Sequence, residues 1–152
     1  MRIAIGADHA GFELKEVVKQ ALDELRTPYK DFGTESDDSV DYPDYAARVA
    51  NAVAGGEFDR GILVCGTGIG MAITANKVPG IRAAVCHDVY SAERARKSND
   101  CQVMALGARV IGEEYAKSLV DTWLKSDFEG GKSTAKVERM KEIEQQFTAS
   151  KK

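Results

Sequence analysis

The sequence predicts an α/β protein in which five parallel strands form a sheet with helices on both faces. Short apolar runs alternate along the chain with longer segments whose apolar residues recur at helical spacing. Parallel strands joined by helices bury both faces of their sheet, which gives a three-layer sandwich. Because crossovers are right-handed, few strand orders remain, and the Rossmann-like and flavodoxin-like orders lead.

The composition fits a single globular domain over residues 1–152, with 43% hydrophobic and 30% charged residues. The formal net charge is -3 and no dense Lys/Arg cluster occurs, which argues against nucleic acid or a membrane as partner. Three cysteines without framework spacing suit a reducing compartment. The first apolar run is too short for a signal peptide. We therefore expect a cytoplasmic protein.

The first elements follow from short-range patterns. An apolar run over 3–5 predicts a strand that ends at the next glycine, and apolar residues at helical spacing predict a helix over 12–25. A weakly apolar strand over 29–32 is expected at a sheet edge. Pro43 begins a second helix, which ends at the glycine pair 55–56.

The second half repeats this alternation. A buried strand is expected over 61–65 and a helix over 71–77. A fourth strand over 81–86 follows a Pro-Gly turn. A helix is then expected over 90–97, and a fifth strand over 102–106.

The last two helices differ in character. The helix over 115–124 has a broad apolar face that includes Trp123, as expected of a helix packed on the core. A glycine pair separates it from a charged helix over 134–147. The apolar residues of this last helix form only a narrow stripe, so we expect it to protrude and to pack on a partner subunit or on the surface of its own chain.

The segment Cys65-Gly66-Thr67-Gly68-Ile69-Gly70 says most about function. It places a thiol at the carboxyl end of a strand and beside the start of a helix, at the edge where open α/β sheets bind ligands. Exposed backbone N–H groups and the helix dipole favour an anion there, and they favour thiolate over thiol. The segment therefore predicts a reactive cysteine that faces a cradle for negative charge.

Other familiar sites do not fit these residues. The glycines at 66, 68 and 70 miss the last spacing of the dinucleotide motif G-x-G-x-x-G. The stretch Gly6 to Gly11 has the glycine spacing of a P-loop, but Phe12 stands where its lysine belongs. A cysteine phosphatase of the C-x5-R type would need arginine in place of Met71. The histidines and cysteines show no metal-ligand spacing, so no metal is expected.

Polar residues also gather at the ends of other strands. Asp8 and His9 follow the first strand, His87 follows the fourth, and Arg109 lies just past the fifth. The carboxyl ends of parallel strands share one edge, so we expect both histidines there. Ser98 and its neighbour Asn99, directly before the fifth strand, are expected to belong to the same site.

Several motifs, in order along residues 1–147, resemble those of one family: Gly6-Ala7-Asp8-His9-Ala10-Gly11, Asp41-Tyr42-Pro43, Cys65-Gly66-Thr67-Gly68-Ile69-Gly70, Ala75-Asn76-Lys77, Asn99-Asp100 and Gly130-Gly131-Lys132. The chain resembles the type B ribose-5-phosphate isomerases, whose family also holds the galactose-6-phosphate isomerase subunits. The resemblance implies an aldose–ketose isomerase, without metal or organic cofactor, that converts ribose 5-phosphate to ribulose 5-phosphate. It also implies a Rossmann-like homodimer, or a dimer of dimers, with sites at the subunit interface.

The resemblance further implies roles for single residues. Cys65 matches the base that moves a proton between C2 and C1, and Thr67 matches the hydroxyl beside it. Because Ile69 and Met71 are apolar, the chain resembles members that use cysteine, not those that use a glutamate a few residues on. The loop from Gly66 to Gly70, which includes Gly68 and Ile69, matches the amides that hold the enediolate. The matched substrate contacts are Asp8 and Asn99 at the sugar hydroxyls, Tyr42 at the pocket wall, and His9, Arg109, Lys132 and Lys136 at the phosphate.

Two features depart from the family pattern. Ser98 stands where a histidine usually opens the furanose ring, and our hypothesis is that His87, or a water held by Ser98 and Asp8, assists this step. Lys132 and Lys136 stand where arginines are usual. Lysine keeps the charge but loses the bidentate fork, so we expect weaker phosphate binding.

Other functions remain open at this stage. The chain is alternatively an isomerase of another sugar phosphate, such as allose or galactose 6-phosphate, or of a rare sugar. A non-catalytic sugar-phosphate-binding regulator is a further alternative, although such a protein has no use for an activated Cys65. A thiol redox role lacks a C-x-x-C motif. Cys86 and Cys101 are interpreted as small apolar fillers.

Overall fold

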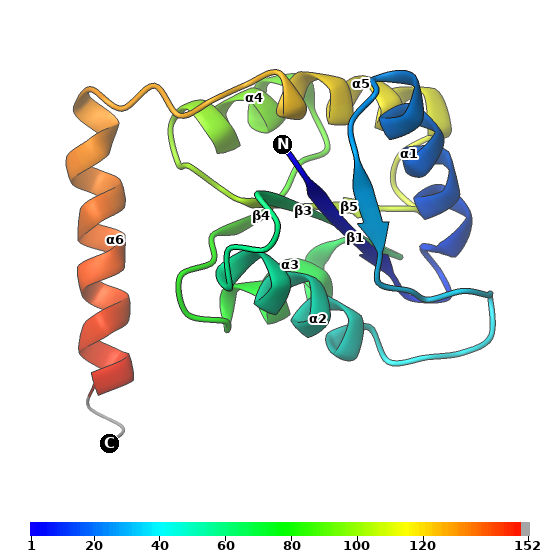
Figure 1. The fold of residues 1–152 in the computed structure, drawn as a ribbon, viewed down its shortest axis with the longest axis horizontal. Helices are drawn as coiled ribbons and strands as arrows, with labels where there is room; N and C mark the ends of the chain where they lie inside the picture. Colours follow the sequence, from blue (N-terminus) through cyan, green and yellow to red (C-terminus); the bar gives the residue numbers. More distant parts are fainter. Residues whose placement is uncertain (150–152) are drawn as a thin grey trace.

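The computed structural model describes residues 1–149, and the last three residues of the predicted domain lie outside the described residues. Five strands form one sheet in this part of the chain (Figure 1). The strands are β1 (Ile3–Ala7), β2 (Tyr29–Asp31), β3 (Arg60–Cys65), β4 (Ala83–Val85) and β5 (Val103–Gly107). The helices are α1 (Phe12–Glu24), α2 (Tyr42–Ala54), α3 (Ile69–Asn76), α4 (Val89–Lys97), α5 (Glu113–Leu124) and α6 (Lys132–Ala149).

Every pair of neighbouring strands is parallel, and the strand order is β2-β1-β3-β5-β4. This confirms the predicted α/β class. The order shares β2-β1-β3 with flavodoxin-like sheets and exchanges the last two strands. The chain leaves β1 toward β2 and then returns to place β3 on the other side of β1. The carboxyl ends of β1 and β3 therefore flank a switch point, where ligands bind in open α/β sheets.

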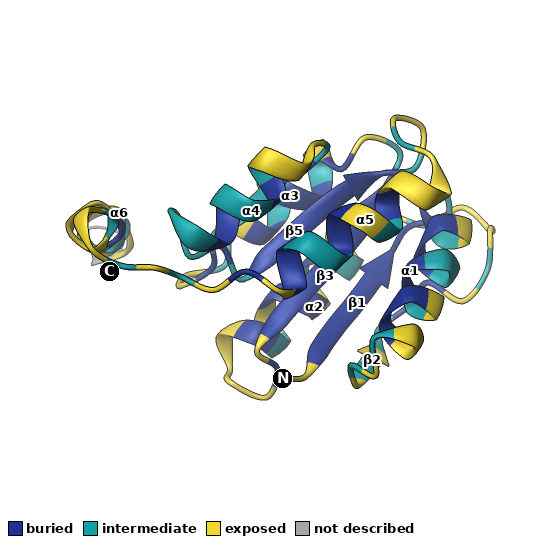
Figure 2. Cartoon of the chain, turned by 90° about the horizontal axis from the view of Figure 1, so that it is seen from above, coloured by how far each residue is buried: buried dark blue, intermediate teal, exposed yellow. Residues whose placement is uncertain are grey.

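Two apolar clusters, one on each face of the sheet, make up the core and confirm the three layers (Figure 2). One cluster joins the sheet to α1, α4 and α5, and its largest buried side chain is Trp123. The other joins the sheet to α2 and α3 through residues such as Val49 and Met71. Burial on both faces explains why β1, β3 and β5 read as nearly continuous apolar runs.

The outer strands are short. β2 lies at an edge, as its weak apolar character predicts. β4 forms the other edge and covers only the middle of the predicted strand over 81–86. The side chain of Asn76 satisfies the outward-facing backbone groups of this edge strand at Ala83. It accepts from the Ala83 N–H at 2.8 Å and donates to the Ala83 carbonyl at 2.9 Å. In the interior, β1 does not end at Gly6 but continues to Ala7, because Gly6 is paired with Leu63 of β3.

Helix α6 stands apart from the sandwich, as predicted (Figures 1 and 2). It begins at Lys132, two residues before the predicted start. Val137 is buried, whereas Met140 and Ile143 are exposed. The Glu144 carboxylate accepts a hydrogen bond from the Gly80 N–H at 3.0 Å, which ties α6 to the turn before β4. None of the helices within residues 1–149 combines the length and the apolar character needed to cross a membrane.

A completely buried lysine fastens α1 to the end of β2. Lys15 Nζ lies 2.8 Å from both carboxylate oxygens of Asp31 and also donates to the Thr34 carbonyl. Lys19 donates to the same carboxylate at 3.0 Å. Burial acts to raise the pKa of Asp31, but hydrogen bonds from Lys15, the Gly33 N–H and Lys19 outweigh it and lower this pKa. The carboxylate is thus held ionised between two ammonium groups.

We expect Asp31→Ala to lower the free energy of unfolding by about 3 kcal/mol, because it leaves the buried Lys15 ammonium without its counter-ion. Denaturant unfolding at neutral pH measures this loss. The double variant Lys15→Met, Asp31→Ala has no buried charge and should be more stable than Asp31→Ala alone. A double variant less stable than Asp31→Ala would contradict this account.

Candidate active site

A pocket of about 380 Å³ opens at the carboxyl edge of the sheet, beside the switch point between β1 and β3. It is lined by Asp8, Tyr42, Cys65, Gly66, Thr67, Ile69, Gly70, Ile73 and Arg109. All of these except Ile73 were predicted as site residues from the sequence. One chain therefore assembles the thiol, a carboxylate, a phenol and a guanidinium around one cavity.

Cys65 is the last residue of β3, and its side chain is buried at the wall of this pocket. Its Sγ accepts a hydrogen bond from the Gly68 N–H at 3.1 Å. Gly68 is the N-cap of α3, so the amide and the positive end of the helix dipole both face the sulfur. This is the arrangement predicted from the sequence, and it stabilises negative charge on the sulfur.

The other two cysteines lie in a different environment. Burial raises the pKa of Cys86 to about 12 and that of Cys101 to about 11. Both thiols are therefore protonated near neutral pH, and neither lines the pocket around Cys65. Their interpretation as buried filler residues is confirmed.

The loop after Cys65 lies directly on the end of β5. Gly68 has φ +81°, a left-handed conformation that favours glycine, and a Cβ there would lie 3.0 Å from the backbone of Leu106. A Cβ on Gly107 would lie 2.7 Å from the backbone of Thr67. The Cys65 carbonyl accepts from the Ala108 N–H at 2.8 Å. Backbone contact, and not side-chain packing, thus sets the direction in which the Gly68 amide points.

Asp8 and Tyr42 approach the pocket from the side opposite to β5. Asp8 is almost fully buried, and its Oδ1 accepts from the Gly11 N–H at 3.0 Å, which fixes the carboxylate at the start of α1. The ring of Tyr42 rests on Gly70, where a Cβ would lie 2.3 Å from the ring Cε1. Gly70, in the first turn of α3, is therefore matched to an aromatic wall from α2.

Arg109 and Thr67 complete the rim. The Arg109 N–H donates to the Gly66 carbonyl at 3.0 Å, and its guanidinium lies over Gly66. The Thr67 hydroxyl oxygen accepts from the Ile69 N–H at 3.2 Å. The pocket thus combines one guanidinium with the amide-rich start of a helix, which suits an anionic ligand.

Both histidines lie at the carboxyl edge, as predicted, but neither lines the pocket. His9 Nδ1 accepts from the Val40 N–H at 3.1 Å and fastens the segment before α2. His87 Nε2 accepts from the Gly107 N–H at 2.9 Å, so its ring continues the hydrogen bonding of β5 beyond the end of β4. Burial lowers the pKa of His87, and the neighbouring Asp88 carboxylate opposes this only in part.

The remaining predicted residues are not brought to Cys65 within one chain. Ser98 and Asn99 precede β5, whereas Cys65 ends β3. Because the strands are parallel, these residues lie at opposite ends of the strands, separated by about 16 Å along a strand. Asn99 lines another cavity of about 540 Å³ between β4, α4 and Met140. Lys132 is exposed on the first turn of α6, and so is Lys136 on its second turn. The expectation that all predicted site residues lie together in one chain is therefore met by only some of them.

Ile73 is the lining residue that sequence reasoning missed. It lies one helical turn after Ile69 on α3, and both side chains are 56% exposed. The i, i+4 spacing of two isoleucines on a helix that starts at the glycine loop was the signal that placed them on one face. Within residues 1–149, no three His, Cys, Asp or Glu side chains gather as a metal site would require. A reaction without metal stays a prediction.

Comparisons with known proteins identify the family of the chain. Residues 3–140 match the model of the ribose/galactose isomerase family, and the chain belongs to this family. It is an isomerase, and the resemblance seen in its motifs is confirmed.

Individual relatives are similar over nearly their whole length. A Listeria innocua protein named ribose-5-P isomerase B is 58% identical over 145 residues, which cover 95% of this chain and 98% of the relative. A D-erythrulose-4-phosphate isomerase from Pectobacterium atrosepticum is 52% identical over 147 residues, covering 96% and 97%. The solved ribose-5-phosphate isomerase B of Clostridium thermocellum has a TM-score of 0.95 and 50% identity, covering 97% of this chain and 99% of that chain.

The environment of His87 predicts that acid weakens the fold. Because the native imidazole resists protonation at Nε2, the unfolded chain binds more protons as the pH falls through the ordinary histidine value of 6.5. The contribution of His87 to the free energy of unfolding is therefore complete above that pH and declines below it. His87→Gln supplies an acceptor that does not titrate, so it should lose less stability than the wild type between about pH 7.5 and about pH 5.5, which is roughly one pH unit on either side of the ordinary value. Urea unfolding at each pH measures both, and equal losses would contradict the assignment.

Proposed function

We propose that this chain interconverts ribose 5-phosphate and ribulose 5-phosphate through an enediolate, with Cys65 as the base and without a cofactor. The observation that carries the proposal is the Gly68 amide on Cys65 Sγ, at the wall of a pocket that also holds Asp8 and Arg109. The names of the relatives from Listeria innocua and Clostridium thermocellum support the choice of sugar. The unpaired cysteines support a reducing, cytoplasmic setting.

The proton transfer follows from this geometry. The Cys65 thiolate removes the proton from C2 of the opened aldose, and the C2 electron pair forms the C1=C2 bond as the carbonyl oxygen on C1 becomes an oxyanion. The O2 proton moves to O1, and the thiol returns its proton to C1, which leaves a carbonyl at C2. Backbone amides of the loop and of the start of α3 stabilise the oxyanion. Each donor of this kind is worth roughly 3 kcal/mol where it has been removed from other enzymes.

The other pocket residues bind the substrate. We assign Asp8 to the sugar hydroxyls, Tyr42 to the pocket wall and Arg109 to the phosphate. The phosphate supplies binding energy away from the reacting carbons and holds the sugar in register with Cys65. His9, which fastens the loop at Val40, stays a proposed phosphate contact through its other ring nitrogen.

A second copy of the chain completes the site in this proposal. Because Ser98, Asn99, Lys132 and Lys136 lie away from the pocket of their own chain, we propose that a homodimer, or a dimer of dimers, carries them to the pocket of the neighbouring subunit. The exposed apolar side chains of Ile69 and Ile73 beside the pocket fit such a contact.

Ring opening follows from the same assembly. His87 does not line the pocket and its Nε2 already accepts a backbone N–H. We therefore favour a water held between Asp8 and Ser98 of the partner subunit over the imidazole of His87. Burial lowers the pKa of His87, which makes it a poor reservoir of protons at neutral pH.

A second candidate substrate is D-erythrulose 4-phosphate, the sugar in the name of the 52% identical Pectobacterium relative. The same base and oxyanion site serve both reactions, because each moves a proton between adjacent carbons of a phosphorylated sugar. The ratio of kcat/KM for the two sugars decides between them.

Cys65→Ala should lower turnover of ribose 5-phosphate by about 10³-fold, because it removes the base and leaves the fold intact. Proton NMR in D₂O measures both ketose formation and deuterium entering the sugar. Cys86→Ala is the matched control, since it removes a buried thiol outside the pocket, and it should keep wild-type activity. Equal deuterium exchange by Cys65→Ala and the wild type would remove Cys65 from the mechanism.

The shared site predicts complementation between two impaired variants. Cys65→Ala and Asn99→Ala damage opposite halves of the site, so a hybrid dimer contains one site with both changes and one intact site. Co-expression in equal amounts should restore about a quarter of the wild-type sites, by statistical pairing of subunits. Activity no higher than that of the separate variants, although native mass spectrometry detects hybrid dimers, would show that the site lies within one subunit.

A further inference from the structure

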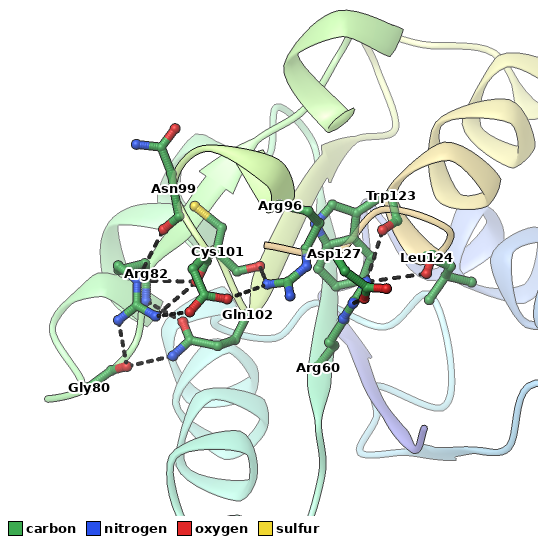
Figure 3. A network of polar contacts seen from close by, with 11 residues as sticks. Arg60, Gly80, Arg82, Arg96, Asn99, Cys101, Gln102, Trp123, Leu124 and Asp127 are labelled. Carbon is green, nitrogen blue, oxygen red and sulfur yellow. Dashed lines mark hydrogen bonds and ion pairs between the residues drawn. The ribbon is translucent and has the colours of Figure 1, made fainter. Parts of the chain in front are cut away.

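A partly buried arginine holds the turn that presents Asn99. Arg82 lies just before β4, and its Nε donates to the Asn99 carbonyl at 3.2 Å and to the Asp100 carbonyl at 3.1 Å. Its Nη2 donates to the same Asp100 carbonyl at 2.9 Å and lies 3.4 Å from the Asp100 carboxylate. Figure 3 shows these contacts converging on the turn from one side. A single guanidinium thus binds both peptide carbonyls of the turn.

The turn requires such support because of its backbone. Asp100 has φ +48°, in the left-handed region that non-glycine residues rarely adopt. A second guanidinium, from Arg96, bonds the Asp100 carboxylate at 3.1 Å and the Cys101 carbonyl at 2.8 Å. The turn is therefore fixed between two arginines, since Arg82 bonds the carbonyls of Asn99 and Asp100, and Arg96 bonds the Asp100 carboxylate and the next carbonyl.

The side chain of Asn99 is free of this network. Its residue is exposed, and in Figure 3 its amide points away from Arg82 while its carbonyl faces the guanidinium. Among the described residues, no side chain or backbone group bonds this amide. A rigid backbone with an unused amide is what a residue needs if it is to contact a ligand outside its own chain.

Arg82 is itself held in place. Its N–H donates to Gln102 Oε1 at 2.8 Å, and Gln102 Nε2 donates to the Gly80 carbonyl at 2.7 Å. The same Gly80 carbonyl lies 3.5 Å from Arg82 Nη1. The guanidinium side chain is only 15% exposed. Its orientation is therefore set before any second subunit or substrate arrives.

We propose that Arg82 is a positioning residue for the isomerase reaction, which acts by holding Asn99 at the angle from which its amide reaches the substrate in the neighbouring subunit's pocket. This inference rests on the proposed function. Lysine does not substitute fully, because a single ammonium lacks the planar fork that spans both carbonyls. Because Asn99 is assigned to hydroxyls near the reacting carbons, its displacement should lower kcat more than it raises KM.

A double-mutant cycle tests this inference with ribose 5-phosphate. Arg82→Ala should lower kcat by about tenfold, since small misplacements of a contacting group cost this much or more. In the Asn99→Ala background, the same change should have no further effect on kcat, because there is no amide left to position. Arg82→Lys should lie between the wild type and Arg82→Ala, and it serves in the same cycle if Arg82→Ala does not fold.

Arg60→Ala is the matched control. Arg60 is a buried arginine that also lies at the amino ends of the strands, but it bonds the Trp123 carbonyl and Asp127 instead of the turn (Figure 3). Any effect of Arg60→Ala on kcat should be equal in the two backgrounds. Thermal melting and size-exclusion chromatography of each variant separate loss of fold or assembly from loss of position.

The outcomes are distinct. An Arg82→Ala effect of equal size in both backgrounds would show that Arg82 only stabilises the fold, and it would overturn the inference while the proposed function stands. Unchanged kcat in Asn99→Ala would also overturn the inference, whereas the role of Cys65 is judged separately by Cys65→Ala. A wild-type enzyme inactive on ribose 5-phosphate would overturn both.

Discussion

The common direction of the strands is the constraint on which the site depends. Every residue that follows a strand lies at the carboxyl ends of the strands, and every residue that precedes a strand lies at their amino ends. Asp8 follows β1, Cys65 ends β3 and Arg109 lies just past β5, and the three meet in one pocket. Asn99 precedes β5 and lines a cavity elsewhere. Chemistry that requires both Cys65 and Asn99 therefore requires two copies of the sheet, and the protrusion of α6 is consistent with the same assembly.

The three cysteines are all buried but have different surroundings. All three are buried, but in Cys86 and Cys101 burial raises the pKa and keeps the sulfur protonated. Cys65 differs because a backbone amide is directed at its sulfur and a pocket opens beside it. That amide is available only because Gly68 adopts a left-handed conformation against the backbone of β5. The surroundings of Cys65 thus come from the fit between a loop and a strand that is distant in sequence.

The sequence was sufficient wherever the determinant is local. The alternation of apolar runs predicted the layers, and the glycine loop predicted the amide at Cys65. Non-local partners were not predictable. Lys15 reads as an ordinary helical lysine, because its counter-ion Asp31 lies on another element. The partner of His87 is a backbone N–H with no side-chain signature. The exchange of β4 and β5 relative to a flavodoxin-like sheet leaves the local apolar pattern unchanged.

Gly80 connects α6 and the turn at Asn99, the two parts of the chain that are proposed to reach the pocket of the neighbouring subunit. Its N–H donates to Glu144 on α6, the helix that carries Lys132 and Lys136, and its carbonyl accepts from Gln102 beside the Asn99 turn. One residue therefore joins the helix of the proposed phosphate contacts to the turn of the proposed hydroxyl contact. In the proposed dimer, this link would let binding of the phosphate at α6 help to place the amide of Asn99 as well.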